Sequence, residues 1–122
     1  MITRLLLVAA GGALGTAARL GIDLVLPAPG GFPLATLLVN VGGAFLIGIV
    51  MVRIERATGI RLFLTTGVLG GFTTYSAFGV GATLLWESAP ALAAGYTALS
   101  LALGVAAAAA GMGLARPRRR TT

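Results

Sequence analysis

Four long apolar runs dominate this chain, and each is long enough to cross a lipid bilayer as a helix. A spanning helix needs about 20 mostly apolar residues. The four runs extend over Leu5 to Leu26, Phe32 to Val52, Leu62 to Trp86 and Ala89 to Ala115. We therefore predict an all-α membrane protein with four transmembrane helices in one domain over residues 1–115.

The overall composition supports the lipid environment and argues against catalysis. Charged residues make up only 10% of the chain, against about 25% in an ordinary soluble domain. The chain has neither cysteine nor histidine, which removes thiol chemistry and the usual zinc sites. Its carboxylates, Asp23, Glu55 and Glu87, are too scattered to suggest a catalytic pair. We predict that the protein is not an enzyme.

The positive charge is carried by nine arginines, which lie at the ends of the apolar runs. Nucleic-acid binding would instead need them spread over an exposed face with aromatic residues between them, so we expect no nucleic acid as partner. With four spans, both termini and the middle connection share one side, and that side holds eight of the nine: Arg4, Arg53, Arg56, Arg61, Arg116, Arg118, Arg119 and Arg120. The positive-inside rule then predicts cytoplasmic termini in one fixed orientation, with residues 116–122 as a basic cytoplasmic tail.

The N-terminus admits a second interpretation. Arg4 followed by the apolar residues 5–10 resembles the first two regions of a signal peptide. However, the apolar character continues past Ala18, and cleavage would leave an odd number of spans. We therefore interpret the segment as the first span.

The third apolar run is unlike the others, because three glycines and the hydroxyl residues Thr73, Thr74 and Ser76 lie near its centre. Glycine is a poor helix former, and threonine and serine hydroxyls compete for backbone hydrogen bonds. A break at membrane depth leaves carbonyls that protein or a bound ion must satisfy. We predict that the third helix is broken near its middle.

Helix packing is the competing explanation for these glycines. Gly67 and Gly71 have the spacing of a small-residue packing face, as do Gly11 and Gly15 in the first run. For Gly67 alone, packing is the favoured interpretation. For the whole block we favour a functional break, because packing does not require hydroxyls clustered with aromatic residues.

Other polar residues inside the spans follow a helical spacing. Thr36 and Asn40 lie four residues apart on the second span, and Tyr96 and Ser100 repeat this spacing on the fourth. Neutral donors and the positive edges of aromatic rings suit a small anion that must be held weakly. For each threonine or serine taken alone, a hydrogen bond to its own helix is the favoured interpretation. For Asn40, interhelical bonding and pore lining are both open.

Three sequence blocks together resemble the CrcB/Fluc family of fluoride channels. The specific one is Gly-Gly-Phe-Thr-Thr-Tyr-Ser-Ala-Phe at 70–78, in the third span. It is supported by Gly-Gly-Ala-Leu-Gly-Thr-Ala-Ala-Arg at 11–19 and by Val-Asn-Val-Gly-Gly-Ala-Phe at 39–45. The resemblance covers essentially the whole chain.

The resemblance implies a four-span channel domain that forms an antiparallel dimer in the cell membrane and exports fluoride passively through narrow pathways. It implies a structural Na⁺, not transported, held by the backbone carbonyls of Gly70 and Thr73. It also implies a vestibule role for Arg19, for which the alternative is snorkelling to the interface. The residues that it places on the fluoride pathway are Thr36, Asn40, Tyr75, Ser76, Phe78, Tyr96 and Ser100.

The chain departs from the family pattern in three ways. Tyr75 and Ala77 stand where the family has Phe and Thr, and Gly81 lies near the place of a frequent acidic residue. The arginine bias also conflicts with an antiparallel homodimer, in which each copy must insert either way. Our hypothesis is therefore a heterodimer with an oppositely oriented paralogue, with the homodimer as the alternative.

Two other functions remain as alternatives. The chain could be a non-conducting partner that completes the pathway of another subunit. It could also be a small four-span drug exporter, which needs a carboxylate within the first span. Asp23 lies too near the connection at residues 27–33 to serve that role well.

Overall fold

The computed structural model describes residues 1–54, 56 and 58–117 of the chain, and the regular structure in these residues is helical. Four helical segments are long and apolar enough to cross a membrane, which confirms the predicted number of spans. The elements are α1 (Ile2–Val25), η1 (Pro29–Gly31), α2 (Leu34–Arg53), α3 (Gly59–Leu62), η2 (Phe63–Leu69), α4 (Gly70–Phe72), α5 (Tyr75–Ser88) and α6 (Pro90–Ala115).

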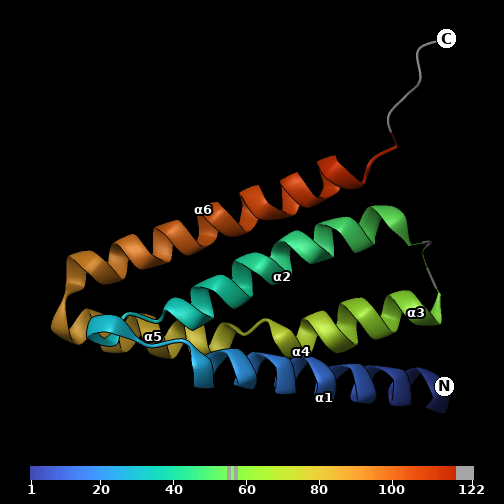
Figure 1. The fold of residues 1–122 in the computed structure, drawn as a ribbon, viewed down its shortest axis with the longest axis horizontal. Helices are drawn as coiled ribbons and strands as arrows, with labels where there is room; N and C mark the ends of the chain where they lie inside the picture. The colour runs from blue at the N-terminus through green and yellow to red at the C-terminus, as the bar shows by residue number, and fades with distance from the viewer. Residues whose placement is uncertain (55, 57, 118–122) are drawn as a thin grey trace, which may run out of the picture.

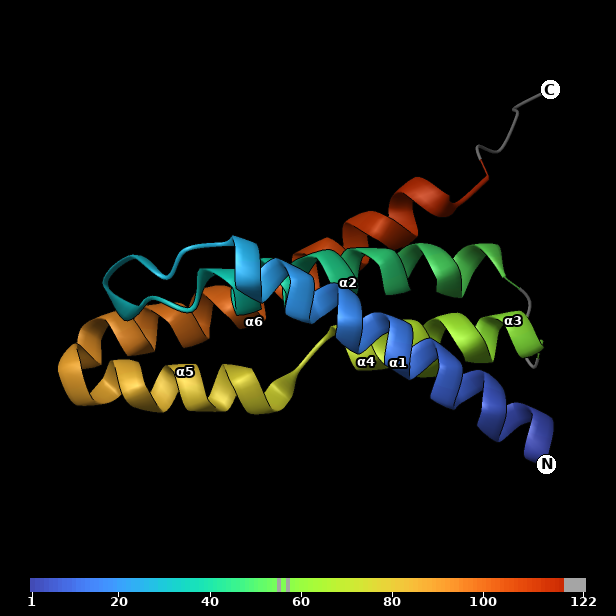
Figure 2. The same cartoon turned by 60° about the horizontal axis from the view of Figure 1, so that its bottom comes forward.

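The helices run back and forth along one long axis (Figure 1). The start of α1 and the end of α6 lie at the same end of the bundle as the end of α2 and the start of α3 (Figure 1). We call this the arginine end, because it holds Arg4, Arg53, Arg56, Arg61 and Arg116. The η1 connection and the turn from α5 to α6 lie at the opposite end (Figures 1 and 2). The predicted tail begins at Arg116, and its residues 118–122 lie outside the described part of the chain.

The helix boundaries follow the predicted spans with small shifts. The second helix begins at Leu34, two residues later than expected, because Pro33 precedes it with a non-helical ψ of 62°. The connection before it turns sharply at Gly30 and Gly31, whose φ angles of 60° and 76° lie in the left-handed region. Glycine adopts this region without the steric cost that a side chain brings.

Helix α1 packs against the first half of the third span through facing glycines. A Cβ atom on Gly11 would lie 2.6 Å from the Phe63 carbonyl oxygen and 2.9 Å from the Cα of Gly67. One turn further on, a Cβ on Gly15 would lie 2.7 Å from the backbone nitrogen of Phe72. Small residues of this kind let two backbones approach closely in a membrane. The packing interpretation of these glycines is therefore confirmed.

Helix α2 packs against α6 in the same way. A Cβ on Gly48 would lie 3.1 Å from the backbone nitrogen of Met112, and a Cβ on Gly111 would lie 3.1 Å from the carbonyl carbon of Phe45. Helix α5 joins this second pair by packing on α6. The small core between them contains Leu37, Leu85, Ala93 and Tyr96.

The third span is broken at Thr73 and Thr74, as predicted. Both residues are extended, with ψ angles of 150° and 125°, and they separate α4 from α5. Figure 2 shows this extended link near the middle of the bundle. The segment before it, η2, is a π-helix over Phe63–Leu69, which the sequence pattern did not predict. π-helical turns are rare and often occur at functional sites.

Two arginines at the arginine end cap helices. Nε of Arg53 donates to the carbonyl oxygen of Ala115 at 2.7 Å, at the end of α6. Nη1 of Arg61 donates to the carbonyl oxygen of Ile54 at 3.2 Å, just after α2. Cations stabilise helix C-termini by satisfying free carbonyls and by opposing the helix dipole. These arginines therefore have a structural role besides the predicted topological one.

Candidate functional site: the broken helix and its aromatic cavity

The break in the third span is held by Asn40, from the neighbouring helix α2. Its side-chain Nδ2 donates to the carbonyl oxygen of Thr74 at 2.9 Å, and its Oδ1 accepts from the backbone N–H of Thr74 at 2.8 Å. The side-chain amide thus replaces both hydrogen bonds that this residue loses where the helix stops. Of the two interpretations left open for Asn40, interhelical bonding is confirmed by this pair.

The hydroxyl residues at the break also satisfy backbone groups. Thr74 Oγ1 accepts from the backbone N–H of Ala77 at 3.2 Å and so caps α5. Ser76 Oγ lies 3.1 Å from the same oxygen. Thr73 Oγ1 donates to the Leu69 carbonyl at 2.8 Å, the expected hydrogen bond to its own helix. For Thr74 and Ser76 that expectation is wrong, because the break draws their hydroxyls to each other.

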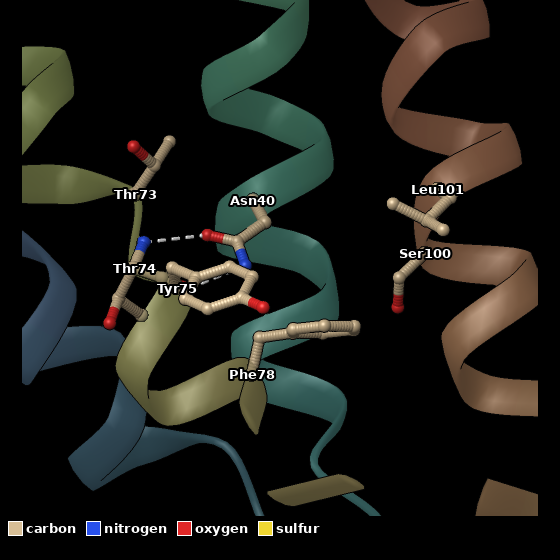
Figure 3. Close-up of a pocket in the computed structure, with 7 residues that line it drawn as sticks. All are labelled: Asn40, Thr73, Thr74, Tyr75, Phe78, Ser100 and Leu101. Atoms are coloured by element: carbon tan, nitrogen blue, oxygen red, sulfur yellow. Dashed lines mark hydrogen bonds between the residues drawn. The ribbon is translucent and has the colours of Figure 1, made fainter. Parts of the chain in front are cut away.

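A cavity of about 280 Å³ opens beside the break. It is lined by Asn40, Thr73, Thr74, Tyr75, Phe78, Ser100 and Leu101. In Figure 3 the Tyr75 ring is drawn next to the Asn40 amide, and the Phe78 ring extends from α5 toward Ser100 on α6. The structure therefore brings together most of the residues that the resemblance assigns to the fluoride pathway.

Aromatic rings form a continuous row from this cavity into the bundle. The Tyr75 and Phe78 ring centroids lie 5.9 Å apart, and those of Phe78 and Tyr96 lie 5.4 Å apart, both tilted. Phe32 meets Tyr96 edge-on, at 5.5 Å with an angle of 83° between the ring planes. Ring edges carry positive potential, so this row presents weak anion-attracting groups without a fixed charge.

Two buried hydroxyls lie along this row, Oη of Tyr96 and Oγ of Ser100. Each has at most the other as a hydrogen-bond partner among the described residues. The expected hydrogen bond of Ser100 to the backbone of its own helix is therefore absent. A buried hydroxyl that lacks a good hydrogen bond costs free energy. A bound ion or ligand that accepts a hydrogen bond there would therefore be stabilised.

The other predicted residues occupy different surroundings. Thr36 is buried one turn before Asn40 but is not among the residues that line the cavity. Ser76 is exposed on the surface of the single chain. Nη1 of Arg19 forms an ion pair with Oδ2 of Asp23 at 3.3 Å, which the sequence analysis did not foresee.

A second cavity, of about 260 Å³, lies on the other side of Asn40. Gly70 and Thr73 line it, together with Thr65 and five other residues including Asn40 itself. Among the described residues, no side chain and no backbone N–H of another helix donates a hydrogen bond to the carbonyl oxygen of Gly70 or Thr73. The atoms of these two residues that could ligate a cation are neutral oxygens.

Two contributors to the site were missed. Oγ1 of Thr16 donates to the Gly71 carbonyl at 3.3 Å, next to the break, and Phe32 extends the aromatic row. Thr16 stands within the first-span block that carried the resemblance, so its hydroxyl was an available signal. Phe32 sits at a predicted span end, where its sequence position gives no indication that it reaches Tyr96.

The four apolar helical segments are those of a multi-pass membrane protein. The family model described as "CrcB-like protein, Camphor Resistance (CrcB)" matches residues 6–112. The chain belongs to this family, whose members are ion channels and not enzymes.

Curated relatives can be aligned with this chain over most of their length. A protein of Cereibacter sphaeroides named "Fluoride-specific ion channel FluC" is 47% identical over 110 residues, covering 84% of this chain and 86% of the relative. Proteins with the same name from Paracoccus denitrificans and Hyphomonas neptunium are 45% and 43% identical, covering 79% and 91% of this chain and 81% and 94% of their own lengths. The family resemblance predicted from the three sequence blocks is confirmed.

Proposed function

We propose that this chain is a subunit of a fluoride-specific channel that lets F⁻ leave the cell passively. The observation that carries the proposal is the aromatic row with two buried hydroxyls, at Tyr96 and Ser100, that have no hydrogen-bond partner among the described residues other than each other. Fluoride is small and strongly hydrated, so donors must replace its water along the path. These hydroxyls and the neighbouring ring edges can supply such donors while binding the ion weakly enough for it to leave.

Fluoride efflux from liposomes tests this proposal. The chain is co-expressed and purified with an oppositely oriented family member and reconstituted with Na⁺ present. F⁻ release is followed with an ion-selective electrode, with Cl⁻ release as control. Fast F⁻ release without Cl⁻ release is the expected result. Phe78→Ile removes the central ring of the row and should slow the flux, whereas Phe63→Ile is a matched control outside the cavity. Equal flux in both variants would contradict the proposal.

The partner of the chain is a paralogue in the opposite orientation. Tyr75 lines the cavity, yet it is 85% exposed in the single chain, so one wall of the cavity is missing. An antiparallel second subunit would supply this wall. The arginine bias then favours a heterodimer, since eight of nine arginines fix one orientation of this chain.

Orientation and partner requirement can be measured separately. Fusion of a cytoplasmic and of a periplasmic reporter to the C-terminus should give signal only from the cytoplasmic one. The chain expressed without other family members should conduct little fluoride, and co-expression with an oppositely oriented family member should restore the flux. Robust flux from the chain alone would refute the heterodimer.

The co-expression experiment also tests the alternative that this chain is a non-conducting partner of another subunit. In the restored heterodimer, Phe78→Ile in this chain should reduce the flux if its own pathway residues meet the ion. If the flux is unchanged, the chain only completes a pathway in its partner.

We also propose that a structural Na⁺ binds beside the second cavity, which Gly70 and Thr73 line. The backbone carbonyls of these two residues would hold it, because hard oxygen ligands suit a hard cation. When bound, the ion would neutralise carbonyl dipoles that the break leaves free. Replacing Na⁺ by N-methylglucamine should therefore lower the melting temperature of the purified protein. An unchanged melting temperature would exclude a structural role for the ion.

A further inference from the structure

The two ends of the bundle differ strongly in charge. Together with the tail, the arginine end accounts for eight of the nine arginines, and its connections contain one carboxylate in sequence, Glu55. The ninth arginine, Arg19, is paired with Asp23, and the third carboxylate, Glu87, lies near the end of α5. Positive charge is therefore concentrated at one end, and the chain has too few carboxylates there to neutralise it.

Hydrogen bonds gather three of these arginines around the connection from α2 to α3. Arg53 donates to the carbonyl oxygen of Ala115, which places it next to Arg116 at the end of α6. Arg61 donates to the carbonyl oxygen of Ile54, the residue directly after Arg53. The ends of α2 and α6 and the start of α3 therefore carry one group of neighbouring cationic side chains.

Arg4 lies beside the same connection. A Cβ atom on Gly59, at the start of α3, would lie 3.2 Å from Cδ1 of Leu7, so α1 meets α3 there. Arg4 is about one helical turn before Leu7 and on the same face of α1. Arg4, Arg56 and Arg116 are exposed, and none of their guanidinium groups forms a hydrogen bond or ion pair with a described residue. These donors are free for a partner from outside the chain.

The arginine end lies at the depth of the lipid head groups. Helix α2 has 20 residues and ends at Arg53, and a helix of that length spans about 30 Å, the thickness of the hydrocarbon core. Large apolar residues close to the arginines in sequence are also exposed, among them Leu6, Ile60 and Leu114. A phospholipid joins a phosphate, which suits the guanidinium groups, to acyl chains, which suit the apolar side chains. A free anion or a nucleic acid would leave those apolar side chains uncovered.

From these observations we propose that the arginine end is a binding surface for anionic phospholipids of the leaflet in which it lies. Guanidinium groups bind phosphate through paired, charge-assisted hydrogen bonds. A phosphatidylglycerol head group keeps its full negative charge, whereas a phosphatidylethanolamine head group brings an ammonium that the arginines repel. The surface therefore prefers the anionic lipid. This inference goes beyond the channel function and does not depend on whether the chain conducts fluoride.

The test is a lipid titration in detergent micelles of the purified assembly that contains the chain, with itself or with an oppositely oriented family member. The probe is dioleoyl phosphatidylglycerol, and bound lipid is counted by native mass spectrometry. Dioleoyl phosphatidylethanolamine is the zwitterionic control, and inorganic phosphate is the free-anion control. Phosphatidylglycerol should bind at least about tenfold more tightly than the zwitterionic lipid. Each arginine near an anionic surface contributes about fivefold to binding, so Arg56→Gln combined with Arg116→Gln should lower the affinity for phosphatidylglycerol about tenfold to thirtyfold.

Two controls separate the effect of charge from an effect on folding. Arg56→Lys combined with Arg116→Lys keeps both charges and should keep the affinity within about threefold of the wild type. The glutamine variant should melt at the wild-type temperature in micelles without anionic lipid, because neither guanidinium bonds to a described residue. The proposal is overturned if the two lipids bind equally, if the glutamine variant keeps the wild-type affinity, or if inorganic phosphate binds as tightly as phosphatidylglycerol.

Discussion

Replacing Asn40 by leucine tests whether its amide holds the break together. Leucine keeps the approximate size of the side chain but cannot replace the hydrogen bonds of 2.9 and 2.8 Å to the Thr74 backbone. Each buried group that loses its partner costs about 1–3 kcal/mol, so the pair is worth about 2–6 kcal/mol. No water is available at membrane depth to compensate, which places the expected cost in the upper part of this range.

The assay is the melting temperature of the purified protein in detergent micelles, followed by the loss of the monodisperse peak on heating. At about 4 °C per kcal/mol for a chain of this size, Asn40→Leu should lower the melting temperature by about 16 °C or more. Thr36→Val is the matched control, because Thr36 is buried one turn earlier on α2 and its hydroxyl makes no hydrogen bond with a described residue. If both variants melt at the same temperature, the amide does not stabilise the break.

Two further predictions concern packing and capping. Gly15→Ala should strongly reduce the yield of folded protein in membranes, because the added methyl group would meet the backbone of the third span, whereas Gly21→Ala should be tolerated since its Cβ would meet nothing within 4 Å. Arg53→Gln should destabilise the protein by about 1–2 kcal/mol in a denaturant or thermal series, because its charged hydrogen bond to the Ala115 carbonyl is lost. Arg56→Gln is the control for the charge change, and an equal effect of both arginine variants would argue against the cap.

Much of the fold could be predicted because the bilayer restricts it so strongly. Span number, the shared side of the termini and the broken third helix follow from apolar length and from the Gly, Thr and Ser residues at 70–76. The π-helix over Phe63–Leu69 could not be predicted, since no local composition distinguishes it from an α-helix. The formation of this π-helix depends on how its backbone packs against α1.

The site was predictable mainly through resemblance to a family, and its chemistry only in part. The spacing of Thr36 and Asn40 places both residues on the same face of α2, yet of the two only Asn40 lines the cavity. Only the turn of α2 that holds Asn40 lies beside the break. Which turn this is depends on how α2 packs against the third span, and the sequence alone does not show it. The Arg19–Asp23 pair could have been predicted from its i, i+4 spacing, but the burial of Arg19 Nε depends on the packing of the helices.

The hydrogen bonds from Asn40 to Thr74 have a consequence for the order of assembly. They lie within one chain, so the interrupted helix has its replacement partners as soon as the second and third spans meet. The break of a newly inserted chain is therefore complete without a contribution from any other molecule. From that moment the chain exposes no unsatisfied Thr74 backbone to lipid.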